Sequence, residues 1–117
     1  MAHTAGVSAT EPLGADCHVR LGADLIRHTW DAVVLTVLRS GPARRGDLIA
    51  RIGGVSDKVV HQSLERLRAH GLVVRSSPRG RYELTAVGSS FAGGPLLALA
   101  RWAEEHRDDL HAAGGPA

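Results

Sequence analysis

Apolar residues recur at helical spacing along the chain, separated by short polar or glycine-rich breaks. A helix is predicted over about 30–39, because its apolar residues share one side: Trp30, Val33, Val34, Val37 and Leu38. Ser40-Gly41-Pro42 ends this helix. Similar patterns predict an earlier helix over about 17–28 and a short one over about 44–52, which Gly53-Gly54 ends.

The segment after the short helix has the most regular apolar pattern in the chain. Val60, Leu64 and Leu67 recur four and three residues apart, so they lie along one face of a helix. Ser56 is typical of an N-cap, and Asp57 favours the first turn because the helix dipole is positive there. The pattern therefore predicts an amphipathic helix with one buried side.

A β-hairpin is predicted to follow this helix, which Gly71 ends. Leu72-Val73-Val74 indicates one strand, Pro78-Arg79-Gly80 indicates a turn, and Tyr82-Glu83-Leu84 indicates the returning strand. Thr85 is a candidate N-cap for a further helix.

The end of the chain is predicted to hold one more long helix, over about 95–111, after a break at Gly93-Gly94-Pro95. Residues 1–14 and 113–117 have no apolar period and are rich in small residues, so we expect a disordered tail and a flexible C-terminus. One domain over 15–112 should therefore contain the whole core.

The order of these elements predicts the fold class, which is mainly α with a small β-hairpin. Two short helices joined by a glycine-containing turn and followed by a hairpin give the order of a winged helix-turn-helix. The major groove of DNA admits one helix, whose outer face can contact base edges. The preceding helix and the hairpin can support it at flanking phosphates. This order favours double-stranded DNA as the partner.

The DNA-facing side of the amphipathic helix follows from its apolar stripe. With the stripe turned inward, a rotation of roughly 100° per residue sends Lys58, Gln62 and Glu65 outward and leaves His61 on the flank. Lys58, His61 and Gln62 can all hydrogen-bond to bases or phosphates. Gln suits an adenine edge, and Lys suits guanine or phosphate.

The charge of the chain permits nucleic-acid binding but does not indicate it alone. Lysine and arginine number 14 against 12 acidic residues, which gives a net charge of +2. The distribution is more informative, because acidic residues gather at 104–109 and basic residues gather at the centre. The central basic residues that we expect near DNA are Arg44, Arg45, Lys58, Arg75, Arg79 and Arg81.

Several motifs within 17–106 together resemble a known family. They are Cys17, Leu25-Ile26, Trp30, Gly41-Pro42, Asp47-Leu48, Gly54-Val55-Ser56-Asp57-Lys58-Val59, Gln62-Ser63-Leu64, Leu67, Gly71-Leu72-Val73, Tyr82-Glu83-Leu84-Thr85, Gly88 and Trp102. In this combination the chain resembles the HxlR-type bacterial transcription regulators of the MarR-like superfamily. It departs from them in a shorter hairpin and in Arg45-Gly46-Asp47, which replaces a segment that begins with an aromatic residue.

The resemblance implies a homodimeric transcriptional regulator on a pseudo-palindromic operator, and we expect it to be a repressor. It implies that Ser56, Lys58, His61 and Gln62 lie at the groove and that the hairpin arginines lie on the DNA backbone. The N-terminal and C-terminal helices are implied to form the dimer interface. The interface residues expected there are Leu21, Leu25, Leu96, Leu99 and Trp102.

The signal to which such a regulator responds is left open by the sequence. Some members of the family sense electrophiles or oxidants through a cysteine, and Cys17 matches that position; a cysteine that only packs as a small hydrophobe is the alternative. A metal site would need Cys17-His18 near His106 and His111 across a dimer, but no pair has a recognised ligand spacing, so neither metal nor cofactor is expected. A small apolar effector between dimer helices, near Gly93-Gly94-Pro95, is the third hypothesis.

Other functions fit the sequence less well. Ser56, Asp57 and His61 have the composition of a catalytic triad, but Asp57 and His61 share one short helix and no glycine-rich phosphate loop occurs, so no enzyme is predicted. A winged helix that binds protein instead of DNA would favour apolar residues where Lys58 and Gln62 stand. No apolar run is long enough to cross a membrane, and a single cysteine suits a reducing cytoplasm.

Overall fold

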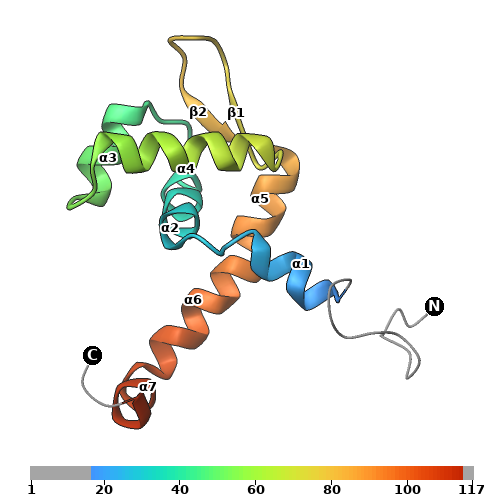
Figure 1. Cartoon of the computed structure of the whole chain (residues 1–117), viewed down its shortest axis with the longest axis vertical. Coiled ribbons are helices and arrows are strands. Elements are labelled where there is room, and N and C mark those ends of the chain that lie inside the picture. The colour runs from blue at the N-terminus through green and yellow to red at the C-terminus, as the bar shows by residue number, and fades with distance from the viewer. Residues whose placement is uncertain (1–16, 115–117) are drawn as a thin grey trace.

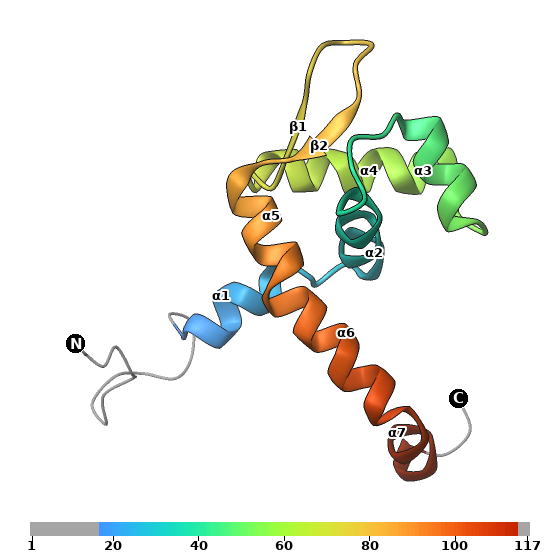
Figure 2. The same ribbon diagram turned by 180° about the vertical axis from the view of Figure 1, so that it is seen from behind.

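The computed structural model describes residues 17–114, with side chains up to residue 110 (Figures 1 and 2). Its helices and strands are α1 (His18–Asp24), α2 (Thr29–Leu38), α3 (Arg45–Ile52), α4 (Asp57–Ala69), β1 (Val73–Arg75), β2 (Tyr82–Leu84), α5 (Ala86–Gly93), α6 (Pro95–Glu105) and α7 (Arg107–Gly114). The tail expected over 1–14 lies outside the described residues, as does 115–117. The helix α7 continues two residues into the expected flexible segment.

Two of the predicted helices have other limits in the structure. The helix expected over 17–28 ends at Asp24, and Leu25 and Ile26 continue in a tighter turn whose amides bond to carbonyls three residues earlier. The helix expected over 95–111 is interrupted at His106. There the imidazole Nδ1 lies 2.9 Å from the carbonyl oxygen of Trp102, which also accepts the amide of His106. The His106 side chain thus adds a second contact to a carbonyl that keeps its regular helical partner.

Both predicted N-caps are confirmed. The Ser56 Oγ accepts a hydrogen bond of 3.1 Å from the Val59 amide, and the Thr85 Oγ1 accepts one of 3.0 Å from the Gly88 amide. Thr85 also donates its hydroxyl to the carbonyl of Gly71. Gly71 has a φ of +77°, which explains why a glycine ends α4.

The hairpin pairs β1 with β2 in antiparallel register, with Val73 opposite Leu84 and Arg75 opposite Tyr82. A third segment joins its edge. Ala43, just before α3, exchanges two backbone hydrogen bonds of 2.8 and 2.9 Å with Tyr82. The sequence did not predict this contact, which ties the start of α3 to the hairpin.

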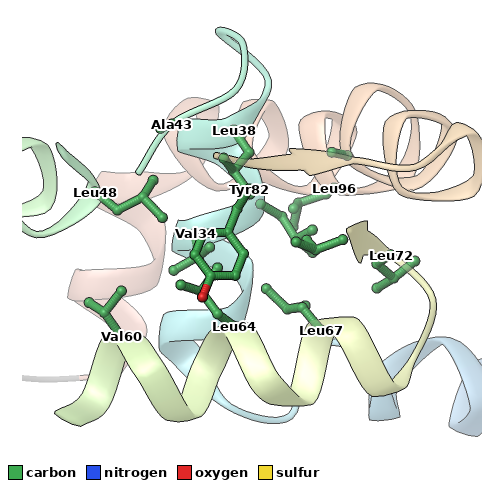
Figure 3. Close-up of a cluster of buried hydrophobic side chains, with 13 residues drawn as sticks. Val34, Leu38, Ala43, Leu48, Val60, Leu64, Leu67, Leu72, Tyr82 and Leu96 are labelled. Atoms are coloured by element: carbon green, nitrogen blue, oxygen red, sulfur yellow. The ribbon is translucent and has the colours of Figure 1, made fainter. Parts of the chain in front are cut away.

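The core lies between α4, α2, α3 and the base of the hairpin (Figure 3). Val60, Leu64 and Leu67 point from α4 into it, and each is completely buried, as their spacing predicted. The Tyr82 ring lies between α4 and α2 and fills the centre of the cluster. Its other buried apolar members are Val34, Leu35, Leu38, Ala43, Leu48, Leu72, Val73, Ala92 and Leu96.

The helices α6 and α7 form an arm that leads away from α4 and the hairpin (Figures 1 and 2). Residues of α1 and α6 line a common pocket, so α1 lies at the base of this arm. The molecule therefore has a head made of α2, α3, α4 and the hairpin, and an arm made of α6 and α7. No helix among residues 17–114 is both long and apolar enough to span a membrane.

Candidate nucleic-acid interface

The outer face of α4, formed by Lys58, His61, Gln62 and Glu65, is exposed along its whole length. The opposite side of the same helix is buried in the core, so the predicted division of the helix is correct. All four side chains of the outer face carry hydrogen-bonding groups at their ends. The packing of the core thus holds a polar helix face at the surface of the head.

Arg45, at the start of α3, contacts α4 directly. Its Nε lies 2.9 Å from Asp57 Oδ1, and its Nη1 lies 3.3 Å from His61 Nδ1. The neighbouring Arg44 is exposed at the N-cap of α3. The structure therefore brings Arg45, Asp57 and His61 together at one point between the two helices.

The hairpin arginines differ in their surroundings. Arg75 is half-buried, with its guanidinium carbon 4.9 Å from the centre of the Tyr82 ring and its Nε 3.4 Å from the Gly80 carbonyl oxygen. Arg79 and Arg81 are exposed. Arg75 thus fastens the turn of the hairpin to its base, while the other two guanidinium groups face solvent.

A buried polar network that the sequence did not predict fixes α4 on α2. The Asp31 side chain is buried, since the residue is only 2% exposed. Its carboxylate accepts one hydrogen bond of 2.6 Å from the Ser63 hydroxyl and two, of 2.8 and 3.0 Å, from the Arg66 guanidinium. The hydrogen bond to Asp31 raises the pKa of Arg66 above its already high ordinary value, with burial acting in the opposite direction. The sequence offered one signal of this network, the acidic residue Asp31 within an apolar helix pattern.

The predicted dimer residues lie at the base and along the arm, with different exposure. Leu21, Leu99 and Trp102 are exposed, whereas Leu25 is half-buried and Leu96 is 6% exposed within the core. The Trp102 ring stacks on His106 with 4.3 Å between ring centres. The arm therefore presents an apolar surface that does not depend on Leu96.

An apolar pocket of about 320 Å³ separates α1 from the start of α6. It is lined by His18, Val19, Gly22, Ala23, Ile26, Phe91, Pro95, Leu96 and Leu99. Cys17, half-buried at the N-cap of α1, directly precedes the lining residue His18 in the chain. Residues on both sides of the break at Gly94, Phe91 of α5 and Pro95 of α6, contribute to this lining.

The residues considered for other chemistry do not converge. Ser56 caps α4, Asp57 accepts from Arg45, and the Nδ1 of His61 also faces Arg45, so their side chains are not arranged as nucleophile, base and orienting acid. No group of three metal-ligating side chains occurs among the described residues. His111, one of the four residues weighed for a metal site, lies outside the described side chains.

The helix pair, the hairpin and the polar outer face of α4 define a winged helix-turn-helix protein. The model of the HxlR-like helix-turn-helix family matches residues 25–111, and the chain belongs to this family. Over 89 residues it is 35% identical to the HTH-type transcriptional regulator YtfH of Escherichia coli, covering 69% of this chain and 70% of YtfH. These findings make the chain a helix-turn-helix transcriptional regulator and confirm the family resemblance.

Two solved structures have the same fold. The structure of ytfH from Salmonella typhimurium matches with a TM-score of 0.72 and 30% identity, covering 88% of this chain and 96% of that one. The quinone-bound YodB of B. subtilis matches with a TM-score of 0.67 and 23% identity, covering 74% of this chain and 96% of YodB. The predicted winged helix-turn-helix architecture is therefore confirmed.

Proposed function

We propose that this regulator binds a specific double-stranded operator as a homodimer and represses transcription by occupying it. The proposal depends chiefly on one observation, the exposed polar face of α4 opposite a completely buried apolar stripe. In this proposal Lys58, His61 and Gln62 reach base edges in the major groove, and Glu65, further from the start of the helix, stays away from phosphates.

The contacts to the DNA backbone are assigned to groups that remain available at the surface of the head. Arg44, Arg79 and Arg81 are exposed and carry cationic donors. The Ser56 hydroxyl accepts the Val59 amide and still has its proton to donate to a phosphate. Arg75 already contacts the Tyr82 ring and the Gly80 carbonyl, so we propose that it stabilises the hairpin.

Homodimerisation through α1 and the arm is supported by the exposed apolar side chains gathered there. Val19, Leu21, Leu99, Trp102 and Leu110 are between 46% and 77% exposed. Large apolar side chains on neighbouring surfaces commonly mark a protein interface. A two-fold dimer would place two copies of α4 on two half-sites about one helical turn apart.

The proposal is tested by binding to genomic DNA fragments at several salt concentrations, followed by footprinting. A regulator of this kind should bind with an affinity that falls steeply with salt and should protect two half-sites. Gln62→Ala should relax the sequence choice, because Gln62 reads a base, whereas Arg79→Ala should weaken binding to all sequences alike. Binding no stronger than that of a generic basic protein would exclude this function.

Release from the operator by an electrophile or oxidant is the second part of the proposal. It is supported by half-buried Cys17, which directly precedes the pocket-lining residue His18, and by YodB, a protein of the same fold whose structure holds a quinone. A quinone or a peroxide should release DNA from the wild-type protein but not from Cys17→Ser. Equal release from both proteins would rule out a thiol sensor and favour reversible occupation of the pocket.

A further inference from the structure

The contact between Arg45 and His61 has a direction that the chemistry of arginine fixes. Arg45 Nη1 and His61 Nδ1 lie 3.3 Å apart. A guanidinium has only donors, so the imidazole nitrogen that faces it must accept. In a neutral imidazole with an accepting Nδ1, the proton is on Nε2.

We infer that Arg45 is a positioning residue that holds His61 as the Nε2–H tautomer and so determines which base edge His61 can read. The inference rests on the proposed function, because it concerns the outer face of α4 on DNA. It assigns Arg45 an action through His61 in place of the direct DNA contact expected from the sequence.

Asp57 gives the arrangement its second point of attachment. The Arg45 Nε lies 2.9 Å from Asp57 Oδ1, while Nη1 of the same planar group is directed to His61. Two contacts from one rigid fork fix the orientation of the guanidinium better than one contact would. The ion pair also offsets the negative charge of Asp57, which would otherwise repel phosphates near the start of α4.

The tautomer matters because the edges of the bases differ in hydrogen-bonding character. An Nε2–H donates, so it suits the acceptors of guanine, N7 of adenine or O4 of thymine, and it meets an amino donor unfavourably at cytosine. Without Arg45, the imidazole would be free to present either a donor or an acceptor. We therefore expect Arg45→Ala to reduce the discrimination at the base pair next to His61 by about tenfold.

The first test needs no DNA. Nitrogen-15 NMR of histidine-labelled full-length protein at a pH of about 8.5, where an ordinary imidazole is neutral, reports the tautomer of each ring. The His61 signals should be those of the Nε2–H form in the wild type and in Arg44→Ala, and should move toward the average of both forms in Arg45→Ala. An Nδ1–H form in the wild type, or no change in Arg45→Ala, would overturn the inference.

The second test compares operator variants that differ at single base pairs. Arg45→Ala should change the preference at one position, whereas Arg44→Ala, which removes the same charge one residue away, should weaken all variants alike. Because both residues act through one ring, Arg45→Ala combined with His61→Ala should discriminate no less than His61→Ala alone. Uniform weakening by Arg45→Ala would show a phosphate contact and contradict the inference.

The two tests separate this inference from the proposed function. If the protein bound no DNA, the regulator proposal would fail, and the NMR result alone would decide whether Arg45 controls the His61 tautomer. Loss of folding is checked by the amide NMR spectrum. We expect that spectrum to change only locally in Arg45→Ala, because an ion pair whose side chains are 40% and 64% exposed contributes little to stability.

Discussion

Asp31 is a buried charged residue that joins α2 to α4, the helix proposed to face DNA. Its two carboxylate oxygens accept from Ser63 on the buried side of α4 and from Arg66 on the flank. A buried carboxylate is costly unless such partners satisfy it. The network therefore adds directional contacts to the apolar packing of α4 on α2.

The first prediction concerns this network. Asp31→Ala should lower the free energy of unfolding by about 3 kcal/mol, because it leaves Arg66 and the Ser63 hydroxyl without their partner. The measurement is urea unfolding followed by circular dichroism. Glu65→Ala is the matched control, since it breaks an exposed pair with Arg68 and should cost less than about 1 kcal/mol. Equal losses in the two variants would contradict the proposed importance of burial.

No pH dependence of stability is expected from Arg66 near neutrality. Asp31 raises the pKa of Arg66, so the stabilisation is fully present below the ordinary arginine pKa and is lost only as the pH rises through the raised value. Both values lie far above the neutral range. A pH effect on stability between about 6 and 9 would therefore have to come from other groups.

Individual side chains also show which features of the candidate site could be predicted from the sequence and which could not. The outer face of α4 could be predicted, because its apolar spacing fixes which residues point away from the core. The partners of Arg45 and Asp31 could not, since they lie 12 to 35 residues away and a long guanidinium group can reach many sites. The number of basic residues alone therefore does not show which arginines are already held by other side chains, as Arg75 also illustrates.

At the scale of elements, the junction between the hairpin and α5 is held by a close backbone approach. The Thr85 amide donates a hydrogen bond of 3.0 Å to the carbonyl of Leu72, and Thr85 Oγ1 accepts one of 3.0 Å from the Gly88 amide. Gly88 faces the same Leu72 carbonyl so closely that a Cβ would overlap it. The Thr-x-x-Gly motif at the hairpin exit thus combines two roles: Thr85 caps α5, and Gly88 leaves room for the Leu72 carbonyl.

Gly88→Ala is the second prediction. It should lower the free energy of unfolding by about 2 kcal/mol or more, because the new methyl group meets the backbone of Leu72 and must push α5 away from it. Gly46→Ala is the matched control. Gly46 lies inside α3 with open space around its Cα, so alanine there should stabilise the protein by up to about 1 kcal/mol. Thermal unfolding of both variants should show shifts of opposite sign, and a stabilised Gly88→Ala would refute the explanation.

The order and type of the elements could be predicted, but two boundaries and one pairing could not. Caps at Ser56 and Thr85 fixed helix starts because they act on amides three residues away. The break at His106 coincides with an imidazole that contacts the Trp102 carbonyl and stacks on the Trp102 ring, and apolar spacing does not reveal these contacts. The pairing of Ala43 with Tyr82 is non-local, so no short motif encodes it.

At the scale of the whole molecule, the head and the arm have opposite surface chemistry. The head carries the polar outer face of α4, while the arm and α1 carry most of the large exposed apolar side chains. In the proposed dimer, a shift at the arms would change the spacing of the two copies of α4. The pocket between α1 and α6 lies where a small ligand could affect that geometry.

The third prediction tests whether the arm holds the proposed dimer together. Leu99 is 48% exposed on α6, and Leu99→Glu would place a charge in the proposed interface. Light scattering should therefore find a monomer. Its affinity for the full operator should be about a hundredfold lower than that of the wild type, because one protein molecule no longer binds both half-sites of the operator. Binding to an isolated half-site should remain. Val74 is similarly exposed, at 46%, but lies on the hairpin, so Val74→Glu should stay dimeric. A dimeric Leu99→Glu protein would move the interface away from the arm.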